Sequence, residues 1–200
     1  MPEESQGIVL ASASPRRSAL LEKVGVRCQV IPSDTDEVLI AEETAEAHAV
    51  RLSRDKALEV ARRQPVAGRW FIGSDTIVVL DGAILGKPAD AAAARAMLNS
   101  LSGRHHRVVS GYAVHDRVSG RTISAAVMTK VFFKELTSRE IEGYIATGEP
   151  FDKAGAYAIQ GIGSFMIPRI EGSYTNVVGL PLCEVIAALE ELGAIELFTG

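Results

Sequence analysis

Two adjacent arginines, Arg16 and Arg17, stand in the first turn of a predicted helix, directly after a serine and a proline. The free N–H groups and the dipole of a helix start favour anions there and disfavour cations. A bound polyphosphate would satisfy both the guanidinium groups and the helix start, because both donate to phosphate oxygens. The alternative is a solvated or carboxylate-paired arginine pair, which needs no ligand.

Asp75 is the charged residue of an otherwise largely apolar run over residues 70–80. Apolar residues on both sides of it indicate a strand that is buried on both faces. A buried carboxylate without a partner is costly, so Asp75 needs a lysine, hydrogen bonds or a metal ion. Held in this way it can orient Mg²⁺ or accept a proton from water. The alternative is a carboxylate that only accepts bonds from nearby backbone N–H groups.

Several other charged residues stand where they could join such a site. Lys56 lies at the border of the apolar stripe of a predicted helix, so its ammonium could reach inward, although a lysine at the surface is the simpler interpretation. Lys87 sits in a glycine-proline turn from which it could reach a phosphate, and Asp152 and Lys153 form a charged pair beside small residues. Each of these signals is weak when taken alone.

Composition limits the classes of function. A chain of 200 residues, 47% hydrophobic and 23% charged, suits one large domain or two tightly joined lobes. Its net charge of −4 argues against bulk binding of nucleic acid. The segment Met1–Gly7 lacks a signal-peptide pattern and no apolar run is long enough to span a bilayer, so we expect a cytoplasmic protein that binds neither nucleic acid nor membrane.

The cysteines and histidines give little evidence of a site. Cys28 and Cys183 lie in separate apolar stretches without metal-ligand spacing, and we expect both to be small core residues in a reducing compartment. His105 and His106 adjoin at the start of a predicted strand, and we expect both to be exposed. Residues 82–88 are one residue short of a phosphate-binding P-loop, and residues 160–163 lack the third glycine of a dinucleotide fingerprint.

Strands and helices alternate in the predicted element order, which indicates an α/β fold with a mixed sheet. We expect strands at 8–11, 26–31 and 70–80, a tight turn at 81–82, and a hairpin of residues 107–118 and 122–133. We expect helices at 15–25, from Thr44 to about 63, at 91–101, from Thr137 toward 147, and from Pro181 to about 192. An acidic loop is expected at 32–37 and a glycine-spaced loop at 152–163.

Four motifs together resemble the Maf family of nucleoside triphosphate pyrophosphatases. They are Leu-Ala-Ser-Ala-Ser-Pro-Arg-Arg at residues 10–17, Gly-Ser-Asp-Thr at 73–76, Gly-Lys-Pro at 86–88 and Asp-Lys-Ala-Gly-Ala-Tyr-Ala-Ile-Gln-Gly at 152–161. The resemblance implies a mixed twisted sheet with two lobes around a deep cleft, similar to the inosine triphosphate pyrophosphatases. It implies one Maf-like domain over residues 1–200 without a separable linker, a homodimer, and a divalent metal cation, Mg²⁺ or Mn²⁺.

The resemblance also implies roles for individual residues. The family's catalytic residues match Asp75, Glu37, Lys56 and Lys87, with Asp75 as proton acceptor and Glu37 and Asp75 as the metal candidates. The family's substrate-binding residues match Ser12, Arg16, Arg17, Thr76, Asp152, Lys153 and Gln160. Because Asp75 and Thr76 would face opposite sides of a regular strand, we predict a bulge or bend there.

Three of these positions distinguish subtypes of the family. Arg16, Thr76 and Gln160 are similar to the dTTP/UTP pyrophosphatase group, whereas the 7-methyl-GTP group has an acid in place of the glutamine. The implied reaction is metal-assisted attack of water on the α-phosphate of dTTP or UTP, with modified pyrimidine nucleotides left open as substrates. Ala158 replaces a usual glycine near Gln160, a change that could tune substrate preference. The alternatives are a pyrophosphatase for 7-methyl-GTP or another modified purine nucleotide, and a nucleotide-binding regulator of cell division without turnover.

Overall fold

The computed structural model describes residues 7–198 of the chain. The expectation about a signal peptide concerned residues 1–7 and so falls almost wholly outside the described residues. Within the described range, no helix combines the length and the apolar composition needed to cross a membrane.

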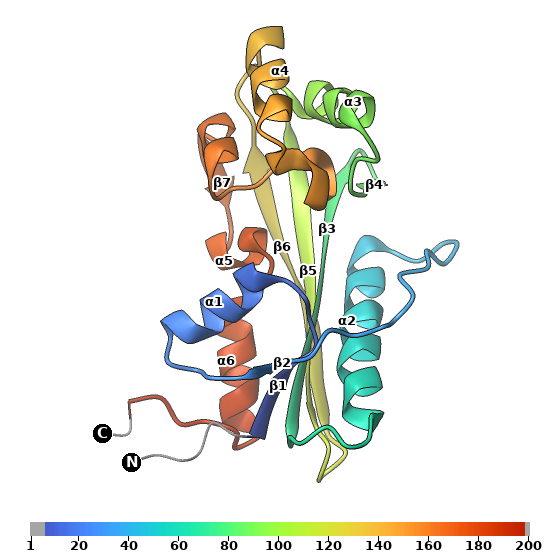
Figure 1. Cartoon of the computed structure of the whole chain (residues 1–200), viewed down its shortest axis with the longest axis vertical. Coiled ribbons are helices and arrows are strands. Elements are labelled where there is room, and N and C mark those ends of the chain that lie inside the picture. The colour runs from blue at the N-terminus through green and yellow to red at the C-terminus, as the bar shows by residue number, and fades with distance from the viewer. Residues whose placement is uncertain (1–6, 199–200) are drawn as a thin grey trace. The chain divides into compact units, whose positions relative to one another are not determined.

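Strands and helices alternate along the chain, which confirms the predicted α/β class (Figure 1). The strands are β1 (Ile8–Leu10), β2 (Gln29–Val30), β3 (Trp70–Leu80), β4 (Ala83–Leu85), β5 (His105–Asp116), β6 (Thr122–Phe132) and β7 (Arg169–Glu171). The α-helices are α1 (Pro15–Lys23), α2 (Ala45–Arg62), α3 (Ala91–Leu101), α4 (Ser138–Ala146), α5 (Tyr174–Val178) and α6 (Leu182–Glu191). Short 3₁₀ helices are η2 (Glu149–Asp152), η3 (Ala154–Ala156) and η4 (Ile162–Met166).

Side chains just before three helices explain where these helices begin. The Thr44 hydroxyl accepts the Ala47 N–H at the start of α2, and the Asp90 carboxylate accepts the Ala93 N–H at the start of α3. Thr137 and Glu140 form a capping box at α4, each accepting a backbone N–H of the other. Such caps satisfy N–H groups that have no partner inside the helix. The predicted starts at Thr44 and Thr137 are therefore confirmed.

The strands form one seven-stranded sheet in the order β2-β1-β3-β5-β6-β7, with β4 paired to β3. β1 is parallel to both β2 and β3, whereas β4 is antiparallel to β3 and β7 antiparallel to β6. The sheet is therefore mixed, as predicted. The expected strand at 26–31 is too long, because regular pairing with β1 holds only for Gln29 and Val30.

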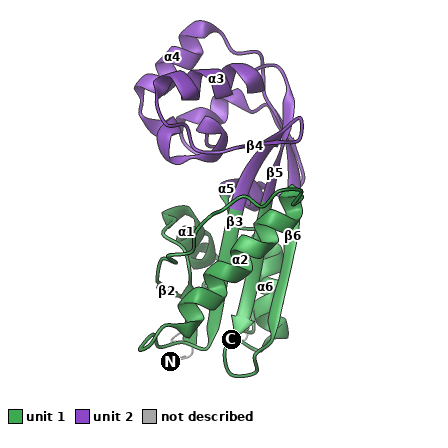
Figure 2. Ribbon diagram, turned by 90° about the vertical axis from the view of Figure 1, so that its right-hand side faces the viewer, with its two compact units in different colours: residues 1–75, 110–127, 179–200 green, residues 76–109, 128–178 purple. Residues whose placement is uncertain are grey.

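The chain divides into two compact units (Figure 2). The first comprises residues 1–75, 110–127 and 179–200, and the second comprises residues 76–109 and 128–178. In the first unit, α2 covers one face of the strands, and α1 and α6 lie on the opposite side (Figure 1). A Cβ atom at Gly73 would lie 1.9 Å from the Ser53 carbonyl oxygen of α2. Glycine is required there because the helix backbone approaches the strand so closely.

The second unit has its own apolar core, formed by α3, α4 and parts of the long strands. His106 of β5 lies inside this core with 2% exposure, in edge-to-face contact with Phe133 and Tyr157. The expectation of an exposed His106 was wrong, since the alternation of the strand turns His106 inward and its neighbour His105 outward.

The cysteine prediction also failed in part. Cys183 is exposed and Cys28 is half-buried. Cys183 lies in the first turn of α6, away from the buried stripe that Val185, Ile186 and Leu189 form. Apolar neighbours in the sequence therefore did not indicate which face of the helix packs inward.

Candidate active site

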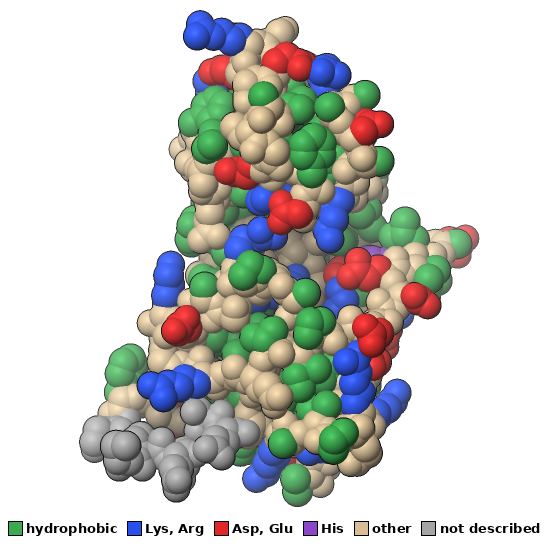
Figure 3. All heavy atoms as spheres, in the orientation of Figure 1, with side chains coloured by type: hydrophobic (Ala, Val, Ile, Leu, Met, Phe, Trp, Pro, Cys, Tyr) green, Lys and Arg blue, Asp and Glu red, His purple; other side chains and the backbone are tan. Residues whose placement is uncertain are grey.

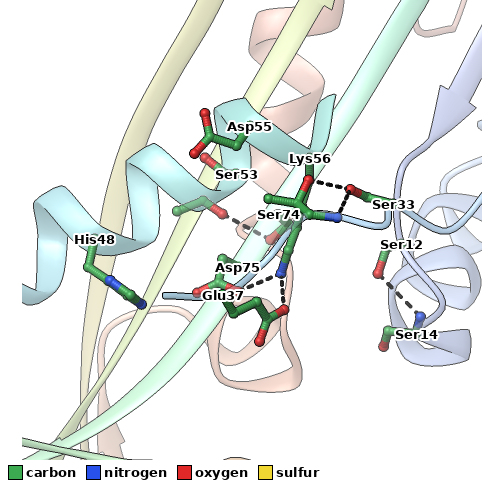
Figure 4. Close-up of polar contacts among 12 residues, drawn as sticks. Ser12, Ser14, Ser33, Glu37, His48, Ser53, Asp55, Lys56, Ser74 and Asp75 are labelled. Atoms are coloured by element: carbon green, nitrogen blue, oxygen red, sulfur yellow. Dashed lines mark hydrogen bonds and ion pairs between the residues drawn. The ribbon is translucent and has the colours of Figure 1, made fainter. Parts of the chain in front are cut away.

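Lys56 links two acidic residues of the first unit (Figure 4). Its ammonium donates to Asp75 Oδ1 at 2.7 Å and to Glu37 Oε1 at 2.6 Å. Asp75 comes from the middle of β3, Lys56 from α2 and Glu37 from the segment that precedes α2. Three of the residues expected to be catalytic are thus in direct contact through the Lys56 ammonium.

The packing of α2 on the sheet explains the position of Lys56. Lys56 shares the buried face of the helix with Leu52 and Ala49, and only 8% of the residue is exposed. Of the two interpretations of Lys56, the inward reach of its ammonium is therefore the correct one, and the simpler interpretation of a lysine at the surface was wrong. Asp75 is buried to a similar degree, with 6% exposed, and a buried carboxylate is stable only with such a partner.

Glu37 differs from Asp75 because 60% of its side chain is exposed. It belongs to a segment without regular structure between β2 and α2, in which Val38, Leu39 and Ile40 are also exposed. Figure 3 shows hydrophobic and acidic side chains together on this projecting segment. The triad therefore combines one buried and one solvent-accessible carboxylate on a single ammonium.

Arg51 and His48 of α2, together with Glu43 just before the helix, connect the Glu37 segment to α2. Arg51 Nη2 donates to the carbonyl oxygen of Val38 at 2.9 Å and to Glu43 Oε2 at 2.7 Å. His48 Nδ1 lies 3.1 Å from the same Glu43 oxygen. Hydrogen bonds from Arg51 lower the pKa of Glu43 to about 2. The sequence analysis missed Arg51 and Glu43, since nothing in their spacing separates them from ordinary surface residues.

Arg17 is held by hydrogen bonds at the start of α1. Its Nη1 donates to Ser12 Oγ at 2.9 Å, and its Nε donates to the Gly179 carbonyl oxygen at 2.7 Å. Burial lowers the pKa of Arg17, while the charge of Asp75 acts in the opposite direction. Arg16 is its half-buried neighbour in the same turn. The arginine pair thus lies at a helix start as predicted, and Arg17 is oriented by protein groups.

Ser74, a residue of β3, also forms a hydrogen bond with Gly179, the residue that accepts a bond from Arg17. Its hydroxyl group, which is completely buried, lies 3.2 Å from the Gly179 carbonyl oxygen and 2.9 Å from that of Gly111. Ser74 and Arg17 therefore donate toward one shared carbonyl group. The motif that contains Asp75 and the helix start that contains Arg17 are joined in this way through Gly179.

The remaining predicted residues belong to the second unit. Thr76 follows Asp75 in β3, which continues without interruption through both residues, so the bulge or bend stays a prediction. Lys87 is exposed in the turn that follows β4, and Gln160 is half-buried after η3. Lys153 Nζ contacts the Asp152 carboxylate and donates to the Glu149 carbonyl oxygen at 2.7 Å.

The acidic pair fits a divalent cation. Mg²⁺ binds oxygen ligands and commonly uses one or two carboxylates together with substrate phosphates. Glu37 and Asp75 supply two carboxylates that converge on one point, currently the Lys56 ammonium. Among residues 7–198 no group of three or more histidine, cysteine, aspartate or glutamate side chains is arranged to hold a metal. Glu37 and Asp75 therefore offer two carboxylates of the type that such a cation uses, one of them open to solvent.

Comparison with known proteins gives one family over nearly the whole chain. A family model described as Maf-like protein matches residues 7–192. A dTTP/UTP pyrophosphatase from Syntrophotalea carbinolica is 66% identical over 99% of this chain and 90% of that protein. Another dTTP/UTP pyrophosphatase, from Geotalea uraniireducens, is 56% identical over 98% of this chain and 100% of that protein.

A solved structure is also similar. It is a nucleoside-triphosphatase, also titled dITP/XTP pyrophosphatase, from Mycobacterium abscessus. It is 17% identical, with a TM-score of 0.47, over 93% of this chain and 97% of that chain.

Proposed function

This chain belongs to the Maf family, and from that premise we propose that it hydrolyses dTTP and UTP to the monophosphate and pyrophosphate. The proposal depends above all on the relatives named dTTP/UTP pyrophosphatase, which are 66% and 56% identical over almost the full chain. The contact between Lys56 and the buried Asp75 supports it, because a hydrolase needs a positioned group that can accept a proton from water.

In the proposed reaction, water attacks the α-phosphorus. A bond forms between the water oxygen and phosphorus, the bond from phosphorus to the bridging oxygen breaks, and pyrophosphate leaves with that oxygen. Asp75 accepts the proton of the attacking water, and Lys56 holds Asp75 in place. Phosphoryl transfer depends mainly on positioning and charge stabilisation, which suits a site made of fixed carboxylates and cations.

The proposed substrate contacts use the remaining predicted residues. In the first unit, Ser12 and Arg17 would bind phosphate oxygens at the start of α1. In the second unit, the triphosphate group would be bound by Lys87, Lys153 and Asp152. The base would be read by Arg16, Thr76 and Gln160.

We propose that Glu37 and Asp75 hold a divalent cation, Mg²⁺ or Mn²⁺. When bound, such a cation would neutralise negative charge on the phosphate oxygens. Activity should disappear after dialysis against EDTA and return on addition of either ion. Full activity in the presence of EDTA would contradict this part of the proposal.

The function is tested with a panel of nucleotides at equal concentration, with monophosphate and pyrophosphate measured separately. We expect dTTP and UTP to be the preferred substrates, with one pyrophosphate released for each monophosphate. Preference for 7-methyl-GTP or inosine triphosphate would overturn the pyrimidine assignment. Binding of nucleotide without any product in Mg²⁺ or Mn²⁺ would instead favour a regulator without turnover.

We also propose that the protein acts as a homodimer in the cytoplasm. Light scattering during size-exclusion chromatography measures the mass of the particle directly. A mass of twice the 21.3 kDa chain is expected, and a monomer would contradict the proposal.

A further inference from the structure

Glu149 lies in the second unit and is not among the predicted site residues. Its side-chain carboxylate accepts hydrogen bonds from three groups of that unit. Its Oε1 accepts the Tyr144 hydroxyl at 2.9 Å and the Gly163 N–H at 3.0 Å, and its Oε2 accepts the Ile162 N–H at 3.1 Å. Burial favours protonation of Glu149, but the N–H groups of Gly163 and Ile162, the Tyr144 hydroxyl and the charge of Lys153 together lower the pKa of this carboxyl. An ionised carboxylate accepts such bonds strongly.

Residues 158–163, which include Gln160, are hydrogen-bonded to Glu149 and to its partner Tyr144. Tyr144 Oη also accepts the Ala158 N–H at 3.3 Å, so the residues on both sides of Gln160 are fastened to the pair of Tyr144 and Glu149. Gly161 has a φ of 73°, and a Cβ atom there would lie 2.7 Å from Glu149 Oε2. Only glycine allows the backbone to turn so closely over the carboxylate.

Glu149 is also connected to Lys153. Its backbone carbonyl oxygen accepts the Lys153 ammonium at 2.7 Å. One residue therefore contacts the proposed phosphate-binding lysine through its main chain and the Gln160 segment through its side chain.

We propose that Glu149 is a positioning residue, which with Tyr144 sets the backbone of Gln160 and so controls discrimination between pyrimidine and purine bases. This inference rests on the proposed function, because it concerns a residue assigned there to the base. Glu149 does not itself contact the nucleotide; it acts through the turn that carries Gln160. A side chain that reads a base must be held firmly, since small displacements weaken discrimination.

The test uses Glu149→Gln, which keeps the size of the side chain but offers one acceptor oxygen in place of two. Glu142→Gln is the matched control, because Glu142 is an exposed glutamate of the same unit that pairs with Arg95. Hydrogen exchange of the amides of residues 158–163 is measured first. We expect exchange there to become about tenfold faster in Glu149→Gln and to stay unchanged in Glu142→Gln. Unchanged exchange in Glu149→Gln would overturn the proposal.

The kinetic arm compares kcat/KM for dTTP with kcat/KM for dGTP. We expect Glu149→Gln to reduce this ratio about tenfold, as the loss of one well-placed contact does, and Glu142→Gln to leave it unchanged. Tyr144→Phe, which retains the Glu149 charge but removes the shared hydroxyl, should shift the ratio in the same direction. A lower kcat at an unchanged ratio would assign Glu149 a purely structural role and overturn the proposal.

A double variant shows whether Glu149 acts through Gln160. In a Gln160→Ala background, Glu149→Gln should cause no further loss of the ratio, because the group that it positions is gone. Additive losses would contradict action through Gln160. If the wild-type protein releases no pyrophosphate from dTTP or UTP, the proposed function fails and the selectivity role fails with it. The exchange measurement then still decides whether Glu149 holds the turn.

Discussion

The ammonium nitrogen of Lys56 lies 2.7 Å from Oδ1 of Asp75, so that a helix residue supplies the counter-charge of a carboxylate at the centre of β3. Both residues are at least nine-tenths buried. Each would be unfavourable without the other, because an isolated charge loses its hydration on burial. The pair therefore connects the stability of the first unit with the chemistry proposed for it.

Asp75→Asn should remove turnover while the fold is retained. The amide cannot act as proton acceptor, so we expect pyrophosphate release from dTTP to fall about 10²-fold or more. Release is measured at saturating nucleotide, with circular dichroism to verify the fold. Asp55→Asn, a substitution of a more exposed carboxylate on α2, serves as the control and should retain normal activity. Near-normal release by Asp75→Asn would contradict the catalytic role.

Lys56→Met should destabilise the protein, because it leaves Asp75 buried without its cation. We expect the free energy of unfolding to decrease by about 2–4 kcal/mol, somewhat limited by the partial access of solvent to the pair. Urea denaturation measures the change. The double variant Lys56→Met/Asp75→Leu should recover most of the stability but none of the activity, since two apolar side chains can replace a buried ion pair. If the double variant does not recover stability, the stability lost in Lys56→Met does not come from an unpaired Asp75.

Ser74→Ala should loosen the region around Arg17. The variant loses the hydroxyl that donates toward the Gly111 and Gly179 carbonyl oxygens, and we expect the free energy of unfolding to fall by about 1–2 kcal/mol. The KM for dTTP should rise, because Arg17 shares the Gly179 carbonyl group. In Ser18→Ala, which removes an exposed hydroxyl bonded to the Pro15 carbonyl oxygen, stability should stay within about 0.5 kcal/mol. Equal effects in both variants would contradict the prediction.

His106 should make stability depend on pH. Burial, and then the neighbouring His105, lower the pKa of His106 to about 4 from an ordinary value of 6.5. Between these values the unfolded chain binds the proton and the folded chain does not. Stability is therefore complete above pH 6.5 and decreases as the pH falls toward 4, by roughly 3 kcal/mol.

The pH prediction is checked by urea denaturation between about pH 4.5 and 7.5. His106→Gln should flatten the profile in this interval relative to wild type. His105→Gln, at the exposed neighbouring position, should retain most of the slope. A wild-type profile without a decrease below pH 6.5 would contradict the burial of a neutral His106.

Local patterns were sufficient for most of the elements. The strand at Trp70–Leu80 and the helix at Ala91–Leu101 have the predicted bounds, and α2 begins after Thr44 as expected. Apolar periodicity and capping bonds act within a few residues, so the sequence records them directly. The inward side of Lys56 was not determined in this way, because a place at the border of the apolar stripe of α2 also suits a lysine at the surface.

Packing between segments that are distant in the sequence decided which side chains are buried and which polar groups are in contact. The sequence indicated that Asp75 needed a partner, but the identity of that partner depends on how closely α2 approaches β3 over Gly73. The burial of His106, the exposure of Cys183 and the hydrogen bonds of Glu149 were missed, because each depends on which groups of other segments lie opposite.

The sequence by itself therefore determined the α/β class, most of the elements and the charged residues that could act on a nucleotide. The tertiary structure decided which of these charges are in contact, since Lys56 and Asp75 lie 19 positions apart and meet only when helix and strand pack together. It also decided that Arg17 and Ser74 share the Gly179 carbonyl group. Side-chain type is a local property, whereas the partner of a buried polar group is set by packing, which must satisfy that group away from water.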